Sequence, residues 1–355
     1  MSKNVCFVMP GMSGGGAERV VSILANEFVR EGHDVTIFLT NFTQIAYDLD
    51  DRIHIDMSCA QSKANFVGQI RAIRKKMKDL RDAVFISFMD NQNLFTIIAG
   101  IGMPNHVVIS QRNDPHRAFE GRTLVRALHP WIYTWADYVV MQTQDALEYY
   151  PSYAKNKYSV ILNPLNSNLP ARYEGPRSHR VVAVCRLNEQ KNLPLALDAF
   201  KDFSVDFSDY TFEIYGEGEL KDELQAYATN IGIGRKVLFK GFRKNVYDCI
   251  IDASMFIISS DFEGLSNSMI EAIALGIPTI ATDCPIGGAR MVINNGRNGY
   301  LVPVRDRAKL AAAMKKIAGS PEIQKRFGEE GVKLRDRLSI HSIVNQWLSV
   351  IEMSK

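Results

Sequence analysis

The 355-residue sequence contains no apolar run that approaches the roughly 20 residues needed to span a membrane. Its first apolar stretch, Val5 to Pro10, is short and is followed at once by glycines, which does not fit a signal peptide. We therefore expect a cytoplasmic protein.

Cysteine is also scarce. The five cysteines are single and widely separated, without the paired spacing of a metal site: Cys6, Cys59, Cys185, Cys249 and Cys284. We expect reduced, structural thiols and no bound metal. The formal net charge of +3 is too small for a general nucleic-acid binder, so no nucleic-acid partner is expected.

Two nucleotide-binding motifs are absent. The glycine-rich run Pro10–Arg19 follows an apolar stretch, but Gly16 is followed by Ala17 and Glu18 instead of the Lys and Ser/Thr of a P-loop. The second expected strand ends without the acidic residue of a dinucleotide site, which argues against a dehydrogenase as well as an ATPase. Free N–H groups at the start of the following helix could still hold an anion, and a plain tight turn is the alternative.

A weak metal-binding pattern, Asp48-Leu49-Asp50, lies beside Asp51 in a polar stretch. We interpret it as a solvated acidic turn.

Short apolar runs alternate with helix-like stretches in two series, which predicts an α/β fold with two doubly wound, Rossmann-like domains. The periodicity stops between Asn163 and Arg180, where proline and glycine indicate a linker. We assign residues 1–165 to an N-terminal domain that binds the acceptor, 166–338 to a C-terminal domain that binds the donor, and 339–355 to a last helix. The second series includes a helix expected over 245–253.

The stretch from Ser259 to Pro278 runs from a strand end through a polar loop into a helix, and ligands bind open α/β sheets at such ends. Glu263 in the loop could face a sugar, and Glu271 could reach ribose hydroxyls. The N–H groups at the start of the helix could bind a diphosphate: Asn267, Ser268 and Met269. A capping box between Ser268 and Glu271 is the alternative.

Further candidates follow other strands of the second series. Arg186 and Lys191 suit a leaving diphosphate, whose negative charge grows in the transition state, although two such cations also fit a solvated loop. Gly216 permits the close approach of a nucleoside, and backbone groups near Phe242 could meet a base. Each of these last two segments alone is typical of a turn.

Taken in order, these segments resemble the retaining glycosyltransferases of family four, which have the GT-B fold: Gly15–Glu18, Arg186 with Lys191, Tyr215–Gly218, Glu263 with Glu271, and Gly296–Val302. The resemblance covers nearly the whole chain. It implies two Rossmann-like domains that face each other across a cleft, with the last helix crossing back onto the N-terminal domain and Trp347 as its anchor. It also implies retaining transfer from a nucleotide sugar, with neither a metal nor another cofactor.

By this resemblance Arg186 and Lys191 would bind the diphosphate, Glu271 the ribose and Glu263 the donor sugar. Front-side displacement is the expected route, and double displacement with Glu263 as nucleophile is the alternative.

In the N-terminal domain, the resemblance would put Gly15 and Gly16 near the phosphate and the acceptor, with Glu18 on the acceptor side. Many family members have a histidine near the donor sugar where this chain has Arg112 and Asn113. These two residues are therefore acceptor-side or sugar-side candidates.

The expected reaction transfers a hexose or N-acetylhexosamine, with UDP as the default nucleotide, to a saccharide or a polyprenyl-diphosphate-linked saccharide in bacterial surface glycan assembly. The alternatives are a sugar-nucleotide 2-epimerase and a non-catalytic nucleotide-sugar-binding protein.

Positive charge is concentrated in the first domain. Seven cations and two acids lie between Lys63 and Asp82, around an amphipathic helix expected over 64–80. Such a helix can lie on an anionic membrane or pack its apolar face into the core. A second basic and aromatic region, from Arg112 to Trp135, is another candidate surface for the membrane or a polyprenyl diphosphate. We expect peripheral association with the inner face of the cytoplasmic membrane.

Overall fold

A computed structural model describes residues 2–353 of the protein. These residues form two compact units. Unit 1 contains the described residues up to Pro164 and those from Ile340 onward, whereas unit 2 comprises Leu165–Ser339. Each unit is a parallel sheet wound by helices, which confirms the predicted α/β class with two Rossmann-like domains.

Unit 1 is built on a parallel sheet with the strand order β3-β2-β1-β4-β5-β6-β7. Its strands are β1 (Asn4–Met9), β2 (Asp34–Leu39), β3 (His54–Asp56), β4 (Val84–Phe88), β5 (Val107–Ser110), β6 (Tyr138–Met141) and β7 (Tyr158–Val160). Its helices are α1 (Gly16–Arg30), α2 (Ser58–Gln61), α3 (Phe66–Asp79), α4 (Asp90–Gly100), α5 (Thr123–Tyr133), α6 (Gln144–Glu148) and α14 (Ile340–Met353), with 3-10 turns η1 (Pro115–Arg117) and η2 (Ser152–Lys157).

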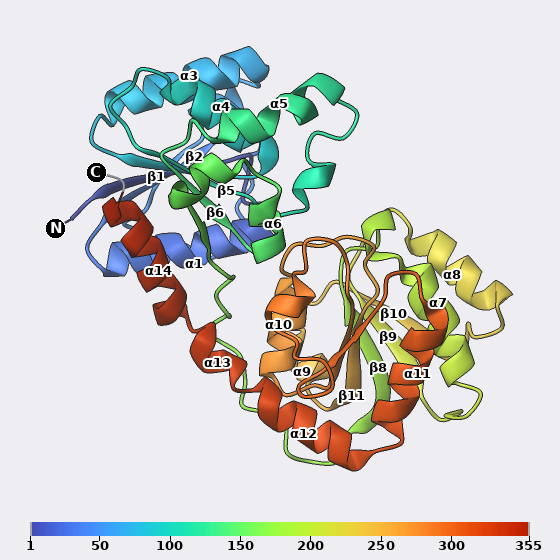
Figure 1. The fold of residues 1–355 in the computed structure, drawn as a ribbon. Coiled ribbons are helices and arrows are strands. Elements are labelled where there is room, and N and C mark those ends of the chain that lie inside the picture. Colours follow the sequence, from blue (N-terminus) through green and yellow to red (C-terminus); the bar gives the residue numbers. More distant parts are fainter. Residues whose placement is uncertain (1, 354–355) are drawn as a thin grey trace. The chain divides into compact units, whose positions relative to one another are not determined.

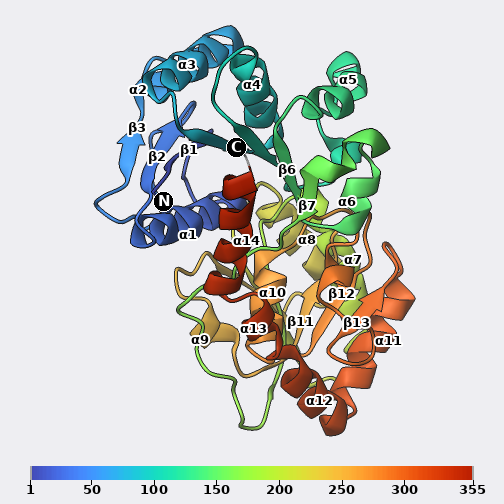
Figure 2. The same ribbon diagram turned by 60° about the vertical axis from the view of Figure 1, so that its left-hand side comes forward.

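Helices cover both faces of this sheet. In Figures 1 and 2, α3 and α4 lie at one face while α1 and α14 lie together at the other. All five residues of β4 are consequently buried, and four of them are apolar, which is typical of a parallel strand covered on both sides.

The last helix belongs to unit 1, as the family resemblance implied. The Trp347 ring is fully buried and stacks on Phe88 at the end of β4, with ring centroids 5.6 Å apart. The Nζ atom of Lys3 donates to the main-chain carbonyl of Ile351 at 2.9 Å. Because one contact reaches β4 and the other the residue before β1, α14 is an integral part of this unit.

Unit 2 repeats the plan with the strand order β10-β9-β8-β11-β12-β13. Its strands are β8 (Ser178–Val184), β9 (Thr211–Tyr215), β10 (Val237–Gly241), β11 (Ala253–Ile258), β12 (Thr279–Thr282) and β13 (Tyr300–Val302). Its helices are α7 (Leu193–Phe203), α8 (Lys221–Asn230), α9 (Tyr247–Ile250), α10 (Asn267–Ala274), α11 (Arg307–Ala318), α12 (Pro321–Gly331) and α13 (Leu334–Arg337), with 3-10 turns η3 (Glu189–Lys191) and η4 (Ala289–Met291).

The core of unit 2 lies between its sheet and the helices α7, α8 and α11. Phe200 and Phe203 of α7 pack there with Phe212 of β9. In both sheets the strand order reverses once, between β1 and β4 in unit 1 and between β8 and β11 in unit 2. Ligands of doubly wound folds bind at such switch points, outside the carboxyl ends of the strands.

One predicted helix is too long, and one helix of the structure has no counterpart in the prediction. The helix predicted over 245–253 is only the short α9, because Ala253 already opens the fully buried strand β11 between β8 and β12. Helix α4 was not predicted at all. Seven of its eleven residues are buried, so its sequence lacks the one-sided apolar stripe of a surface helix.

Candidate functional site

At the switch point of unit 2, the loop after β8 is tied to the loop after β11. The Ser259 hydroxyl donates to the carbonyl of Lys191 at 2.7 Å, and the side-chain amide of Gln190 donates to the carbonyl of Phe262 at 2.9 Å. The Asn192 amide donates to the Asp261 carboxylate at 2.8 Å. These bonds join segments about 70 residues apart in sequence into one rigid wall.

Two of the predicted catalytic side chains meet on this wall. The Nζ atom of Lys191 forms an ion pair with Oε2 of Glu263, and the Ser260 hydroxyl donates to the same oxygen at 3.1 Å. The Lys191 and Glu263 side chains are only 15% and 17% exposed. Burial opposes the charged form of Lys191, but the Glu263 carboxylate outweighs it and raises the pKa of Lys191 above its usual value. Lys191 is therefore a fixed cation.

The third predicted catalytic residue, Arg186, follows β8 and is exposed. Among the residues that the structure describes, no carboxylate forms an ion pair with its guanidinium. Arg186 and Lys191 thus provide one open and one paired cation within six residues of chain, a combination suited to a diphosphate.

Helix α10 starts at Asn267 with Ser266 as its N-cap, so the proposed capping box between Ser268 and Glu271 is wrong. Ser268 lies inside the first turn, where Met269 is buried, and the N–H groups of this turn lie at the positive end of the helix. Glu271 is buried farther along the same helix.

Gly216 and Phe242 follow the neighbouring strands β9 and β10. Gly216 has φ +132°, and a Cβ atom on it would lie 1.9 Å from the carbonyl oxygen of Cys185. Only glycine therefore lets the loop after β9 pack onto the loop that carries Arg186. The Gly216 N–H donates to the carbonyl of Gly241, and the next residue, Phe242, is 74% exposed.

A further segment at this edge was not singled out from the sequence. A Cβ atom on Gly288, in the loop after β12, would lie 1.8 Å from the carbonyl oxygen of Gly264, the residue after Glu263. Nearby Ile286 has φ +62°, a strained conformation for a β-branched residue. The paired glycines Gly287 and Gly288, in the loop after β12, were the available signal for this close approach.

The two cysteines nearest the pair remain neutral thiols. Burial raises the pKa of Cys185 to about 11 and that of Cys284 to about 12. This agrees with a structural role for both.

In unit 1 the Glu18 side chain caps the start of α1 at the glycine-rich loop. The N–H groups of Gly14 and Gly15 donate to Oε2 of Glu18 at 2.6 and 2.9 Å, while Gly15 is the N-cap of α1 and Gly16 its first residue. Two N–H groups of the predicted anion loop are therefore bound by a carboxylate of the same chain. Glu18 stands three residues after the N-cap, which is the capping-box position.

Arg112 and Asn113 follow β5, but the Arg112 side chain turns into unit 1. Its Nη1 atom donates to Oδ1 of Asn163 at 2.7 Å, and its guanidinium lies 4.4 Å from the centroid of the Phe88 ring and 5.7 Å from that of Trp347. Burial lowers the pKa of Arg112 to about 9. Arg112 thus links the returning helix to β4.

In the acidic stretch Asp48–Asp51, before β3, the Asp50 carboxylate is paired with a neighbouring cation. Both oxygens of the Asp50 carboxylate accept hydrogen bonds from the exposed guanidinium of Arg52. This supports the interpretation of Asp48–Asp51 as an acidic turn. Within residues 2–353, no group of three or more His, Cys, Asp or Glu side chains has a metal-binding arrangement.

Residues 174–334 match the family model of the glycosyl transferases group 1. Over 98% of both chains, the protein is 26% identical to the Campylobacter jejuni GalNAc-alpha-(1->4)-GalNAc-alpha-(1->3)-diNAcBac-PP-undecaprenol alpha-1,4-N-acetyl-D-galactosaminyltransferase. It is 25% identical to the amylovoran biosynthesis glycosyltransferase AmsD of Erwinia amylovora, over 95% of this chain and 96% of AmsD. This chain is a GT-B glycosyltransferase.

A solved structure has the same fold. The Anabaena protein HepE in complex with UDP and glucose superimposes on the glycosyltransferase with a TM-score of 0.81 at 16% identity, over 99% of this chain and 100% of HepE. The relatives give no support to a sugar-nucleotide 2-epimerase. Within residues 2–353, every helix of the glycosyltransferase is too short or too polar to cross a membrane.

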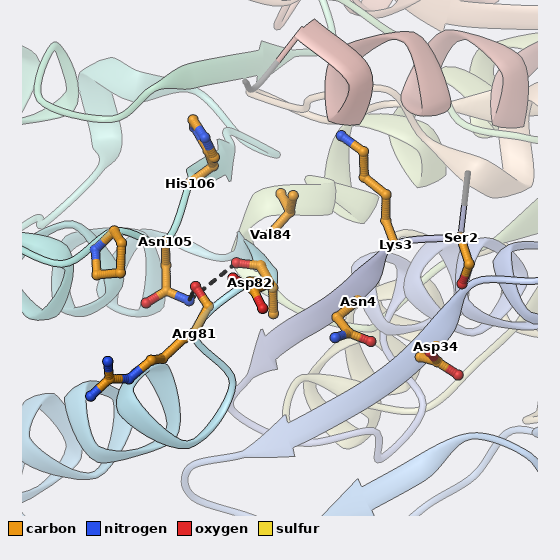
Figure 3. A pocket seen from close by; sticks show the side chains of 11 residues that line it. Ser2, Lys3, Asn4, Asp34, Arg81, Asp82, Val84, Asn105 and His106 are labelled. Atoms are coloured by element: carbon orange, nitrogen blue, oxygen red, sulfur yellow. Dashed lines mark hydrogen bonds between the residues drawn. The ribbon is translucent and has the colours of Figure 1, made fainter.

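The glycosyltransferase also has a cavity of about 590 Å³ at the amino ends of β1 and β4, away from the carboxyl edge of that sheet. Figure 3 shows Lys3, Arg81 and His106 around it, together with Asp34 and Asp82. The Asn105 amide on its wall donates to the carbonyl of Arg81 at 3.1 Å. Because ligands of doubly wound sheets bind at the opposite edge, this cavity is not the substrate site.

Proposed function

We propose that this glycosyltransferase transfers a hexosyl or N-acetylhexosaminyl group from a UDP-sugar to a saccharide or a polyprenyl-diphosphate-linked saccharide, in the assembly of a bacterial surface glycan. The observation that carries the proposal is the Lys191–Glu263 pair at the switch point of unit 2, with the exposed Arg186 five residues before Lys191 in the chain. The names of similar proteins support the substrate classes, because the Campylobacter enzyme acts on a PP-undecaprenol-linked saccharide and HepE was solved with UDP and glucose.

In this proposal Arg186 and Lys191 stabilise the departing diphosphate, and the N–H groups of the first turn of α10 hold its oxygens. Glu263 accepts hydrogen bonds from hydroxyls of the donor sugar, and Glu271 binds the ribose. Losing one such preorganised contact to the transition state lowers kcat by about 100- to 1000-fold.

We also propose that transfer retains the anomeric configuration by front-side displacement. The bond from the anomeric carbon to the diphosphate breaks, and the acceptor oxygen bonds to that carbon on the same face while its proton passes to a departing phosphate oxygen. The support is that Glu263 is paired with Lys191 and Ser260, which weakens it as a nucleophile. A glycosyl adduct on Glu263, detected by mass spectrometry of the enzyme quenched during turnover, would reject this route.

No metal takes part in the proposed reaction, because Arg186 and Lys191 supply the positive charge at the leaving group. The measurement is the transfer rate after treatment with EDTA. An unchanged rate agrees with the proposal, whereas a rate lost with EDTA and restored by Mg²⁺ or Mn²⁺ contradicts it.

For the lipid-linked acceptor we propose peripheral contact with the inner face of the cytoplasmic membrane through α5 and the residues that follow it. Leu124, Leu128, Trp131 and Trp135 are exposed at helical spacing, so they form one apolar stripe, and Arg122 and Arg126 are exposed nearby. Helix α3 fits this role less well. Its Ile73 and Met77 are buried, and its Lys76 pairs with Asp56.

Flotation with anionic liposomes at low salt tests the contact. We expect the native protein to float and the Trp131→Ala/Trp135→Ala variant to remain soluble. Flotation of both proteins would reject α5 as the contact, and flotation of neither would reject membrane association.

The donor site is tested by thermal stabilisation with UDP, GDP, ADP and dTDP in the absence of metal. A diphosphate at about 100 times its Kd adds about 2.7 kcal/mol of stability. We expect UDP to stabilise the protein selectively, the stabilisation to be lost in Arg186→Ala and Lys191→Ala, and the surface variant Lys309→Ala to behave as wild type. If no diphosphate stabilises the protein, the donor site is wrong, and binding of UDP without sugar transfer would favour the non-catalytic alternative.

A further inference from the structure

Unit 1 has a second cavity, of about 680 Å³, at the carboxyl ends of β1 and β2. Ser13 of the glycine-rich loop lines one side, the segment after β2 lines another with Phe42, Thr43 and Gln44, and Gln61 and Lys63 close it from α2 and its end. This is the edge of the sheet at which doubly wound folds bind ligands.

The wall after β2 is held firmly to the glycine-rich loop. The N–H groups of Asn41 and Phe42 both donate to the carbonyl of Pro10, at 2.9 and 2.8 Å, and that of Ala46 donates to Met12 at 2.8 Å. The Tyr47 hydroxyl donates to the carbonyl of Gly15 at 2.7 Å. The cavity is therefore preformed, which lowers the entropy cost of binding.

Phe42 is exposed on the cavity wall that the segment after β2 forms. The residue is 59% exposed although its backbone is held by hydrogen bonds, and a Cβ atom on Gly11 would lie 2.8 Å from the Phe42 Cβ atom. Only a glycine at position 11 therefore leaves room for the Phe42 side chain in this position. An exposed aromatic face with a negative π-cloud can stack on the C–H groups of one face of a sugar ring.

The other lining groups select the class of ligand. Gln44 and Gln61 carry amides and Ser13 and Thr43 carry hydroxyls, all of which can donate and accept hydrogen bonds as sugar hydroxyls require. Lys63 is the one charged residue of the lining, which is too little for a diphosphate, and the amides are too polar for a polyprenyl chain.

We infer that this cavity, with Phe42 as stacking platform, binds a neutral hexopyranosyl unit of the acceptor glycan away from the reacting hydroxyl. The inference rests on the proposed function for the identity of the glycan as acceptor. It gives unit 1 a saccharide subsite that is separate from the donor residues of unit 2.

Saturation-transfer NMR with a panel of neutral oligosaccharides of two to four sugars tests the subsite. We expect a signal with the wild-type protein and one about tenfold weaker or absent with Phe42→Ala and with Gln61→Ala, because an aromatic platform carries much of the binding energy at such a site. The matched control is Phe66→Ala, which removes the ring of a residue that is 62% exposed on α3 and lies outside the cavity lining.

The inference is overturned if no saccharide gives a signal with the wild-type protein, or if the signal is unchanged in both cavity variants. UDP-induced thermal stabilisation is measured on the same four proteins and is expected to be equal in all of them. Saccharide binding without any stabilisation by UDP would leave the subsite standing and contradict the proposed function.

Discussion

Lys191 and Glu263, 72 residues apart in the chain, form a largely buried ion pair at the switch point of unit 2. Neither Lys191→Met nor Glu263→Gln removes the charge of the other partner. Because an uncompensated buried charge is costly, we expect each single variant to lose about 3 kcal/mol of unfolding free energy in urea denaturation.

The double variant Lys191→Met/Glu263→Leu separates stability from catalysis. We expect it to recover most of the lost stability, because no buried charge remains, and yet to stay at least about 100-fold slower in sugar transfer. A double variant that recovers transfer along with stability would show that the pair serves only the fold.

Gly216 and Gly232 both have a positive φ, but only Gly216 lies in close contact with another part of the chain, the carbonyl of Cys185. We expect Gly216→Ala to lose several kcal/mol of stability, because its Cβ atom would collide with the carbonyl of Cys185, and to raise the KM for the donor. Gly232 has φ +85° but no neighbour within 4 Å, so Gly232→Ala should cost only about 1 kcal/mol. Equal losses in the two variants, measured by urea denaturation, would contradict the role of the close contact.

The positions of Arg186, Lys191 and Glu263 near the carboxyl edge of the sheet could be predicted from sequence, because residues that directly follow parallel strands stay at that edge. Their pairing could not. It depends on the adjacency of β8 and β11, which no local pattern encodes, and on the side-chain hydrogen bonds from Ser260 and Asn192.

In unit 1, the direction of a side chain could not be predicted from the sequence. Arg112 and Asn113 both follow β5, and successive residues of an extended chain point to opposite sides. The sequence does not tell which of the two faces the core, and in the structure it is the guanidinium of Arg112 that packs against Phe88 and Trp347. The capping of α1 by Glu18 was open to prediction from its spacing after Gly15.

Trp347 should be the main anchor of the returning helix. We expect Trp347→Ala to cost about 3–5 kcal/mol in urea denaturation, because it empties a fully buried site against Phe88. Trp347→Phe keeps part of the stacking and should cost less. The control is Trp131→Ala on the exposed side of α5, which should change stability little; a loss as large as that of Trp347→Ala would contradict this assignment.

His129 should make unit 1 sensitive to acid. Its ring is fully buried beside Tyr133 and Tyr149, with Nδ1 2.8 Å from the carbonyl of Arg126. Burial lowers the pKa of His129 below its ordinary value near 6.5, and the hydrogen bond to Arg126 opposes this only in part.

Well above pH 6.5 the imidazole is neutral in both states, and its contribution to stability is constant. Below that pH the unfolded chain binds the proton first, so stability falls until the pH reaches the folded-state pKa of His129. Burial also lowers the pKa of His33, which acts in the same direction, and raises that of Asp90, which acts in the opposite one.

Both of those groups remain in a His129→Asn variant, so the difference between the two proteins isolates His129. We expect the variant to be less stable at pH 8, where a buried ring has been lost, but to lose less further stability than the wild type between about pH 6.5 and 5. Urea denaturation across this range is the measurement. Parallel pH profiles for the two proteins would mean that the buried imidazole takes up its proton as readily in the folded chain as in the unfolded one.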